Sequence, residues 1–273
     1  MQWFIALNEP IDPAFVGHTS LYENFAKVAV YSARKNAPGL VPNLIYNGPE
    51  NSFTEEMQAL GVNVFHHKLS FEHLLDSVPG RDDGWRHIAR GAMLRMDLPE
   101  IVSSNETILY TDTDVLFLSD PSIYQFPCGI FAAGPEFAID NFVDINTGSM
   151  IINLENARHS FRELNEWTRF NLHWVPDFDQ GAIKAFFNGN WGRLDPRMNW
   201  KPYWGRNNEA ILVHYHGPKP NRFRPGSFER DFSSGILQSL FDLNPAGYEH
   251  YIRLWYGYYI EYEQEFSSGR RLW

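Results

Sequence analysis

The stretch Ile108-Leu109-Tyr110-Thr111-Asp112-Thr113-Asp114-Val115-Leu116-Phe117 places two carboxylates, one residue apart, between two apolar runs. The first run is typical of a buried strand. Ionised groups are costly in an apolar interior unless they are paired, so we expect a cation to meet Asp112 and Asp114. Oxygen ligands at the point where a strand ends suit a divalent metal ion.

The segments before this stretch alternate between strand and helix patterns. Short apolar runs predict strands, and helical periodicity predicts the helices between them. The predicted strands are residues 3–7, 43–46 and 62–65, and the predicted helices are residues 20–35 and 54–61. This alternation favours a parallel α/β sheet. Open α/β sheets bind ligands outside the carboxyl ends of their strands, which is where Asp112 and Asp114 fall.

The second half of the chain continues the pattern and then changes character. A helix over residues 85–98 is expected to stop at Pro99. The next predicted elements are strands at 129–133 and 210–213, a small polar turn at Thr147-Gly148 that opens onto a buried strand within 145–154, and helices at 155–171 and 182–187. Helices are also expected at 232–243 and 248–266. We therefore expect a catalytic α/β domain over residues 1–224 and a helical, aromatic-rich C-terminal extension over residues 225–273.

Composition excludes several classes of function. The formal net charge is −10, and an acidic chain repels phosphate backbones, so we expect no nucleic-acid partner. Cys128 is the one cysteine among 273 residues and cannot form an intramolecular disulfide, which favours a reducing compartment. No apolar segment approaches the roughly 20 residues that span a bilayer. We expect a cytoplasmic protein.

His214 strengthens the expectation of a metal site. It ends a predicted strand, as the aspartates do, and parallel strands bring their ends together. Two carboxylates and one imidazole suit Mn²⁺ better than Ca²⁺, with Mg²⁺ as the alternative ion. Gly217 and Lys219 follow closely; glycine allows a close approach of backbone to ligand, and lysine suits a phosphate. This set favours a nucleoside diphosphate, although no P-loop or dinucleotide-binding motif is present.

Other interpretations of the Asp-x-Asp pair remain open. An EF-hand loop starting at Asp112 would need Gly and Glu where Phe117 and Ile123 stand, so that motif fails. A phosphatase of the haloacid-dehalogenase type also carries Asp-x-Asp after an apolar strand. Its nucleophilic Asp normally lies on the first strand, so this reading ranks second. A metal-free structural pair ranks third, and a catalytically idle sugar-nucleotide-binding or glycan-binding protein is a further alternative.

Four blocks of sequence, in order, resemble the family 8 glycosyltransferases, which include glycogenin and bacterial lipopolysaccharide galactosyltransferases. The blocks are Arg95-Met96-Asp97-Leu98-Pro99-Glu100-Ile101, Leu109-Tyr110-Thr111-Asp112-Thr113-Asp114-Val115-Leu116, Ile145-Asn146-Thr147-Gly148-Ser149-Met150-Ile151-Ile152-Asn153-Leu154 and His214-Tyr215-His216-Gly217-Pro218-Lys219-Pro220. The resemblance covers residues 1 to about 225. It departs at Asn221, where the family has Trp, at Gly91 and Met93, and in a Gly217–Lys219 spacing one residue short.

The resemblance implies a GT-A fold, with a Rossmann-like, mostly parallel central sheet flanked by helices. It also implies retaining transfer of a hexose from a UDP-sugar, with UDP-glucose and UDP-galactose favoured. The acceptor is a glycan, a lipid-linked molecule or a protein. Carried over by position, Asp112, Asp114 and His214 hold Mn²⁺, Asp112 and Thr113 lie near the ribose, and Gly217 and Lys219 face the phosphates. In the same way, Arg95 reaches the donor sugar or phosphate, Asn146, Thr147 and Gly148 line the sugar, and Asn8 lies near the uracil or ribose.

Asp179 and Gln180 match the family's Asp-Gln pair near the reacting carbon. No carboxylate is evident as the nucleophile that a retaining glycosidase requires, so we expect these two residues to orient the substrate. In the route commonly described for the family, the phosphate of the leaving UDP assists the acceptor hydroxyl.

The C-terminal extension lies outside the resemblance. Its aromatic residues are Trp255, Tyr256, Tyr258, Tyr259 and Tyr262, followed by Arg270, Arg271 and Trp273. This composition permits peripheral membrane contact through an interfacial helix. Packing against the catalytic core or another subunit is the preferred reading, because Glu261, Glu263 and Glu265 oppose an anionic membrane.

Overall fold

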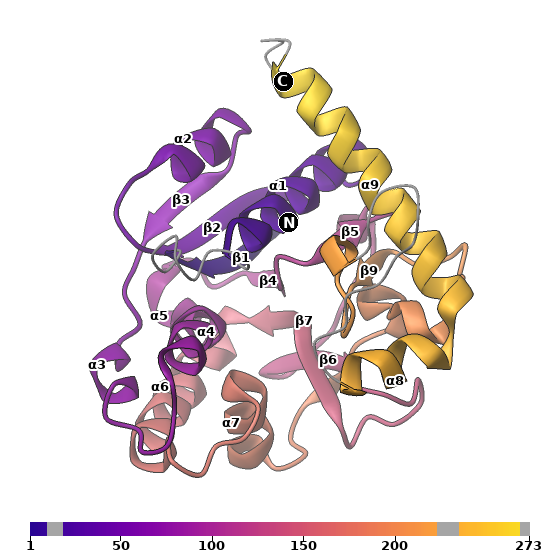
Figure 1. Ribbon diagram of the computed structural model, residues 1–273. Coiled ribbons are helices and arrows are strands. Elements are labelled where there is room, and N and C mark those ends of the chain that lie inside the picture. The colour runs from indigo at the N-terminus through magenta and orange to yellow at the C-terminus, as the bar shows by residue number, and fades with distance from the viewer. Residues whose placement is uncertain (10–18, 223–234, 268–273) are drawn as a thin grey trace.

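The computed structural model describes residues 1–9, 19–222 and 235–267 and contains a central seven-stranded sheet (Figure 1). The strand order is β3-β2-β1-β4-β7-β6-β8. The strands are β1 (Gln2–Asn8), β2 (Val41–Asn47), β3 (Asn63–His66), β4 (Thr107–Thr111), β6 (Phe131–Pro135), β7 (Ile145–Asn153) and β8 (Gly192–Arg193). From β3 to β4 the neighbours are parallel, whereas β7 runs antiparallel to both β4 and β6. The sheet is therefore mixed and mostly parallel, and its antiparallel pairings are those of β7 with β4 and β6.

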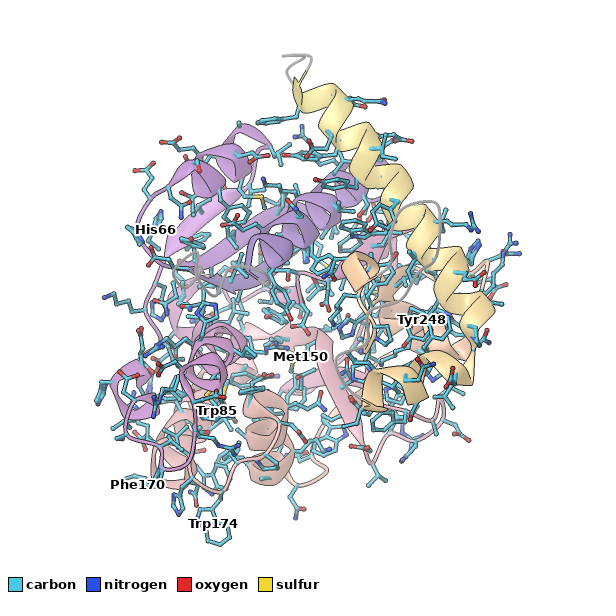
Figure 2. The ribbon with its side chains drawn as sticks, viewed as in Figure 1. His66, Trp85, Met150, Phe170, Trp174 and Tyr248 are labelled. Atoms are coloured by element: carbon cyan, nitrogen blue, oxygen red, sulfur yellow. The ribbon has the colours of Figure 1, made fainter. Side chains whose placement is uncertain are left out.

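Helices cover both faces of the sheet. On one face lie α1 (Thr19–Asn36) and α2 (Ser52–Ala59), and on the other lie α4 (Asp83–Met93), α6 (Leu154–Asn171) and α7 (Phe178–Phe187), as Figure 1 shows. Alternate residues of β1 point to opposite faces, so Trp3 and Ile5 join the core under α1, and Phe4 joins the core under α4 and α6. Met150 of β7 is fully buried at the middle of the molecule (Figure 2).

The predicted helix over residues 85–98 is broken into three short pieces. After α4 ends at Met93, a 3₁₀ helix covers Leu94–Asp97, and α5 follows at Leu98–Ile101. Pro99 lies in the first turn of α5, where a missing N–H costs no hydrogen bond. Proline therefore begins a helix here, and the prediction that it stops one is wrong. The break buries Arg95 within the 3₁₀ helix.

The opening stretch forms two strands that belong to different sheets. β4 ends at Thr111, and β5 (Val115–Phe117) pairs with β9 (Leu212–His214) in a separate two-stranded sheet. The pairing is antiparallel and sets Val115 opposite His214. Asp112, Thr113 and Asp114 therefore form the connection between the two sheets. A three-residue strand carries too little periodicity for this pairing to be predicted.

The C-terminal extension packs on the rest of the protein. It consists of α8 (Gly235–Leu243) and α9 (Pro245–Ser267), and α9 lies along α1 (Figure 1). Trp255 and Tyr262 are buried, and Tyr31 of α1 donates a hydrogen bond of 2.6 Å to Glu265. The hydroxyl of Tyr248 donates to the carbonyl of His216, 2.9 Å away, and so joins α9 to the segment after β9 (Figure 2). The preferred packing of this helix is thus observed.

Several expectations fall outside the described residues. These are the boundary between residues 224 and 225 and the terminal Arg270, Arg271 and Trp273. The most exposed aromatic side chains that the structure describes lie at the end of α6 and just beyond it, not on α9. They are Phe170, which is 81% exposed, and Trp174, which is 72% exposed (Figure 2). None of the described helices has the length and apolarity needed to cross a membrane.

The remaining elements are short. They are α3 (Glu72–Leu75) and 3₁₀ helices at Pro121–Ile123, Pro196–Asn199, Pro202–Trp204 and Pro220–Arg222. The 3₁₀ helix Pro196–Asn199 packs against β9, so the Trp- and Pro-rich connection lies beside His214. This packing matters for the site because it delivers Asn199.

Candidate metal and donor site

Asp112, Asp114 and His214 come together as the sequence predicts, although by a different route. The backbone N–H of Asp112 donates to the carbonyl of Gly148, 2.9 Å away, at the end of the β4–β7 pairing. The backbone N–H of Tyr215 donates to the carbonyl of Asp114 at 3.0 Å. Antiparallel pairing of β5 with β9 therefore brings His214 to the aspartates. The expectation that parallel strand ends would do so is wrong.

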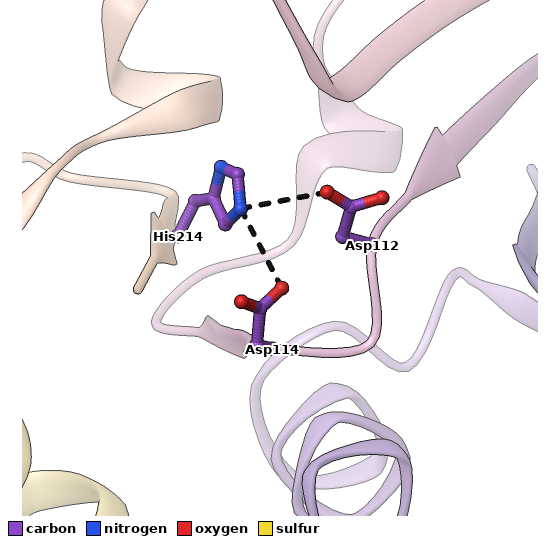
Figure 3. A group of neighbouring side chains, drawn as sticks. All are labelled: Asp112, Asp114 and His214. Atoms are coloured by element: carbon purple, nitrogen blue, oxygen red, sulfur yellow. Dashed lines mark ion pairs between the residues drawn. The ribbon is translucent and has the colours of Figure 1, made fainter. Parts of the chain in front are cut away.

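The three side chains offer ligand atoms that all lie within 4.8 Å of one another (Figure 3). Nε2 of His214 lies 3.6 Å from Oδ2 of Asp112 and 3.5 Å from Oδ1 of Asp114. Two donors that each sit about 2 Å from one cation are at most about 4 Å apart, so the two distances from His214 suit a single small divalent ion. His214 and Asp114 are buried, and Asp112 is partly exposed on the cavity side.

Each aspartate has its second oxygen held by a cationic side chain. Arg95 donates from Nη2 to Oδ1 of Asp112 at 2.6 Å, and Lys219 donates to Oδ2 of Asp114. Burial alone would raise the pKa of Asp114, but Lys219 and His214 outweigh it and hold that pKa well below its usual range. One oxygen of each carboxylate is thus left to face His214. The donor set and its charge fit Mn²⁺ or Mg²⁺.

Gly148 makes this close arrangement feasible. A Cβ atom at this position would lie 2.1 Å from Cε1 of His214 and 2.8 Å from Oδ2 of Asp112, so a larger residue would displace both ligands. The sequence predicts Gly148 as part of a turn lining the sugar. The structure places Gly148 inside strand β7, so the predicted turn is wrong. Gly148 lies against the group formed by Asp112, Asp114 and His214 (the metal cluster), where its missing side chain is the important property.

Arg95 connects the cluster to the helix that carries Asp179 and Gln180. Its Nε lies 3.1 Å from Oδ2 of Asp179, its Nη1 donates to the carbonyl of Thr147 at 2.6 Å, and its guanidinium stacks 4.5 Å from the centre of the Tyr110 ring. Burial favours a neutral arginine, but Asp112 and Asp179 outweigh it and raise the pKa of Arg95, so the guanidinium stays charged. Arg95 therefore holds two carboxylates from different elements.

Asp179 and Gln180 lie in the first turn of α7, which begins earlier than the sequence predicts. Asp177 and Phe178 precede them with φ angles of 52° and 53°, in the left-handed region that non-glycine residues rarely adopt. Asp179 accepts a 2.9 Å hydrogen bond from the Thr147 hydroxyl. Burial raises the pKa of Asp179 to about 6, even though Arg95 opposes the rise. Backbone strain of this kind persists only where the surrounding structure enforces it.

Two cavities share four lining residues, which are Ala92, Arg95, Asp112 and Lys219. The first has a volume of about 200 Å³ and is lined by Ala6, Leu7, Asn8, Tyr22, His87, Ile88, Gly91, Ala92, Arg95, Tyr110, Asp112, Thr113, Asp114 and Lys219. The second has a volume of about 510 Å³ and is lined by Ala92, Arg95, Asp112, Glu136, Phe137, Asp144, Asn146, Thr147, Gly148, Asp177, Phe178, Asp179, Gln180, Lys184, His214, His216 and Lys219. The two cavities flank the metal cluster.

Most of the remaining predicted residues line one of these cavities. Asn8 lies in the first, where its amide contacts His87 Nδ1 at 2.8 Å and accepts from Asn47 at 2.7 Å. Thr113 is buried beside it. Gly217 is the exception, because it does not line either cavity. Its φ angle is 88°, and a Cβ there would lie 2.7 Å from Leu240 of α8, so this glycine allows the extension to pack closely.

Sequence reasoning missed Asn199, Glu136, His216 and His87. Oδ1 of Asn199 lies 3.0 Å from Nδ1 of His214, on the side of the ring away from the aspartates. Glu136 follows β6 and pairs with His216 Nε2 at 2.8 Å. Burial alone would raise the pKa of Glu136, but His216 outweighs it and lowers that pKa to about 2. Asn199 ends a four-residue 3₁₀ helix and Glu136 directly follows β6, and both positions depend on tertiary packing, so no local pattern marks them.

No protein-family model matches the sequence, and a search of curated proteins finds no match. Solved structures do match. The glycosyltransferase GlyE of Streptococcus pneumoniae TIGR4 aligns with a TM-score of 0.62 and 16% identity over 98% of this chain, which spans 63% of the GlyE chain. The galactosyltransferase LgtC, in complex with donor and acceptor sugar analogs, gives a TM-score of 0.61 and 17% identity over 89% of this chain and 95% of LgtC.

Mouse xyloside xylosyltransferase 1 is a third similar structure, with a TM-score of 0.52 and 15% identity over 79% of this chain and 97% of that one. At these identities the similarity concerns the fold. The mixed seven-stranded sheet flanked by helices is the GT-A fold of these glycosyltransferases. The predicted fold class is confirmed.

Proposed function

We propose that this protein is a metal-dependent retaining glycosyltransferase of the family 8 type, which moves a hexose from a UDP-sugar to an acceptor. UDP-glucose and UDP-galactose are the favoured donors. One observation carries the proposal: three ligand atoms converge between two cavities, and the other oxygens of the two aspartates are held by Arg95 and Lys219. In a GT-A fold, this arrangement suits a sugar nucleotide that crosses from one cavity to the other.

In this proposal Asp112, Asp114 and His214 would hold Mn²⁺, with Mg²⁺ as the alternative. When bound, the ion supplies positive charge that stabilises the leaving diphosphate. Arg95 and Lys219 line both cavities, so their charges face the same region and oppose the negative charge that develops on UDP. Gly217 supports the backbone that leads to Lys219.

The first cavity is proposed to take the uridine. Its walls include the small residues Ala6, Gly91 and Ala92, which leave room for a flat ring, while Asn8 and Thr113 offer polar groups. The LgtC structure holds donor and acceptor sugar analogs, which supports two adjoining subsites by analogy. The second cavity, which contains Asn146, Thr147 and Gly148, is then proposed to take the transferred hexose and the acceptor.

The contacts of Asp179 favour an orienting role over a covalent one. Its Oδ2 is within 3.1 Å of Arg95 Nε and accepts from Thr147, so this oxygen is already occupied on two sides. A retaining glycosidase needs a free carboxylate beside the reacting carbon. We propose that the phosphate oxygen of the leaving UDP accepts the proton of the acceptor hydroxyl on the same face of the sugar, while Asp179 and Gln180 orient the sugar.

The acceptor is proposed to be a glycan, a lipid-linked molecule or a protein that presents a hydroxyl to the second cavity. Phe137 and Phe178 line its wall, and aromatic side chains of this kind can pack against a sugar. The single cysteine fits a reducing, cytoplasmic setting. Peripheral membrane contact through α9 is not favoured, because Trp255 and Tyr262 of that helix are buried against the core.

The test is a screen of UDP-sugars for slow hydrolysis with Mn²⁺, alongside phosphate esters with Mg²⁺. We expect hydrolysis of one UDP-hexose, with the α-anomer of the sugar released first from an α-linked donor, and no hydrolysis by Asp114→Ala. Release of the β-anomer would exclude a retaining route. Turnover of phosphate esters without any need for uridine would support the phosphatase alternative. Binding of UDP-sugar without hydrolysis or transfer to any acceptor would support an idle sugar-nucleotide-binding protein.

A further inference from the structure

Two backbone N–H groups fix the orientation of two side-chain amides beside the metal cluster. The N–H of Gly148 donates to Asn146 at 3.1 Å, and the N–H of Thr147 donates to Gln180 at 3.1 Å. A backbone N–H can only donate, so the side-chain atom that faces it must be the carbonyl oxygen. The oxygen and nitrogen of Asn146 and Gln180 are therefore assigned by the chain itself.

These assignments extend to a third amide and then to the metal ligand. Asn146 Nδ2 donates to Oε1 of Gln180 at 3.2 Å, and Asn199 Nδ2 donates to Oδ1 of Asn146 at 3.0 Å. Because its nitrogen is used in this way, Asn199 presents Oδ1 to Nδ1 of His214, 3.0 Å away. An amide oxygen only accepts, so Nδ1 of His214 must carry a proton.

A proton on Nδ1 of His214 determines the state of the other ring nitrogen, Nε2, which faces the metal site. A neutral imidazole with its proton on Nδ1 has a lone pair on Nε2, and Nε2 is the atom that faces Asp112 and Asp114. Groups that bond the second nitrogen of a ligating histidine set its tautomer and ring orientation. Asn199 does this here.

Gln180 lies at the other end of this series of hydrogen bonds, and its own polar atoms are assigned in the same way. Its Oε1 accepts from both Asn146 and Thr147, which uses both lone pairs, and its Nε2 donates to Oε2 of Glu136 at 3.2 Å. The second oxygen of Glu136 is held by His216. Gln180 is thus left with one N–H to offer to a substrate and no free carbonyl oxygen.

We propose that Asn199, Asn146 and Gln180 form a directional amide relay from His214 to Glu136, which holds the metal ligand in its Nδ1-protonated tautomer and makes Gln180 a hydrogen-bond donor. Asn146, Asn199, His214 and Glu136 are all buried, so little water is available to replace a lost link. Asn199 and Asn146 are positioning residues. The tautomer of His214 depends only on the metal site, whereas the role of Gln180 as a donor to the substrate rests on the proposed function.

The first test measures Mn²⁺ affinity by titration calorimetry, with no donor present. Asn199→Leu removes the acceptor for Nδ1, and we expect a loss of about 10- to 100-fold. Asn199→Asp keeps that acceptor but loses the N–H that donates to Asn146, so its Mn²⁺ affinity should lie clearly above that of Asn199→Leu. Asn165→Leu removes a buried amide that bonds Asp97, outside the relay, and should leave Mn²⁺ affinity unchanged. Wild-type affinity in Asn199→Leu would overturn the proposal.

A second test needs no variant and so does not depend on how Asn199→Leu folds. Histidine-selective ¹⁵N NMR of the Mg²⁺-loaded protein reports which nitrogen of His214 carries the proton. The relay predicts a protonated Nδ1. A proton on Nε2 would contradict it.

A third test concerns Gln180. Gln180→Glu replaces the N–H donor by an acceptor that faces Glu136, so we expect kcat for donor hydrolysis to fall at least about 10-fold while Mn²⁺ affinity stays unchanged. Retained or increased kcat would mean that the side-chain oxygen acts on the substrate. That result would contradict the proposed role of Gln180 as a hydrogen-bond donor. If the unchanged protein hydrolyses no UDP-sugar, the proposed function fails, and the Mn²⁺ and NMR results still decide the relay at His214.

Discussion

The two cavities that meet at Asp112 differ in how they are built and in what lines them. The first, of about 200 Å³, lies on the parallel half of the sheet and has small or apolar walls from β1 and α4. The second, of about 510 Å³, lies toward the antiparallel half and carries Glu136, Asp144, Asp179 and Lys184. The first cavity is thus the smaller one, and the second is wider and carries more charged side chains. Under the proposed function, the first would take the nucleoside and the second the sugars. The metal cluster lies between them.

The largest effect should come from a change that reaches both cavities at once. Gly148→Ala would place a methyl group 2.1 Å from Cε1 of His214, within the buried cluster. We expect Mn²⁺ affinity to fall by about 100-fold, because a ligand must move out of position, and UDP affinity to fall with it. Calorimetric titration with Mn²⁺ measures this.

Gly129→Ala is the matched control, because a Cβ at Gly129 meets nothing within 4 Å. Its Mn²⁺ affinity should equal that of the unchanged protein. If Gly148→Ala also bound Mn²⁺ normally, His214 would not be a ligand in the arrangement described, and the two cavities would not share a metal site.

The charge of Asp179 should give the second cavity its own pH dependence. Burial raises the pKa of Asp179 to about 6, so between its ordinary value and pH 6 the folded protein binds more protons than the unfolded chain. Stability from this group therefore falls as pH rises, by about 2 kcal/mol between about pH 4.5 and pH 7.5. Asp179→Asn removes this loss, so it should gain stability relative to the unchanged protein as pH rises. Urea unfolding at the two pH values tests it, and a constant difference would show that Asp179 titrates normally.

A smaller effect is expected from a change in the first cavity that alters UDP binding but not Mn²⁺ binding. Gly91 of α4 lines that cavity, and leucine there would fill part of its volume of about 200 Å³. We expect Gly91→Leu to weaken UDP binding by about 10-fold through exclusion, with Mn²⁺ affinity unchanged.

Gly91→Ala should be almost neutral for UDP binding, because its Cβ would lie 3.4 Å from Asn8, an ordinary contact distance. Titration of both variants with UDP in saturating Mn²⁺ gives the comparison. Equal UDP affinity for Gly91→Leu and the unchanged protein would mean that the nucleoside does not enter the first cavity.

The smallest effect is expected far from both cavities. Glu261 of α9 forms an exposed ion pair with Lys35 of α1. Such pairs contribute less than about 1 kcal/mol, so Glu261→Gln should cost at most that in a urea unfolding experiment. UDP and Mn²⁺ affinity should not change. A loss of UDP affinity in this variant would show that α9 influences the donor site.

Sequence periodicity predicts the elements around the first cavity better than it predicts those around the second, several of whose residues are predicted only through the family resemblance. β1, β2 and α1 have clear periodicity, and the Asp-x-Asp pair between apolar runs is unusual enough to indicate a cation. The walls of the second cavity come from the β6–β7 connection, the strained start of α7 and the segment around His216. Their proximity follows from antiparallel pairings, including the three-residue β5 and β9, which leave no local pattern.

The same difference between local pattern and tertiary packing explains why the sequence misses or misplaces single residues. Asn199 holds His214 from a Pro-rich connection in which one asparagine looks like any other. The family resemblance predicts that Gly148 and Gly217 contact the ligand, but a glycine allows close approach of any neighbouring group. The structure shows that Gly148 makes room for His214 and that Gly217 makes room for Leu240. Pro99 predicts the end of a helix, although proline also occurs in the first turn of helices, as it does in α5.

The most direct test of the account is a titration of the protein with UDP in saturating Mn²⁺ and again in EDTA. We expect UDP to bind at least about 100-fold more tightly with the metal. The reason is that a metal ion held by Asp112, Asp114 and His214 would act on the same diphosphate as the cationic side chains of Arg95 and Lys219. Asp114→Ala should abolish that difference. UDP affinity that is the same with and without Mn²⁺, or no UDP binding in Mn²⁺, would contradict the account.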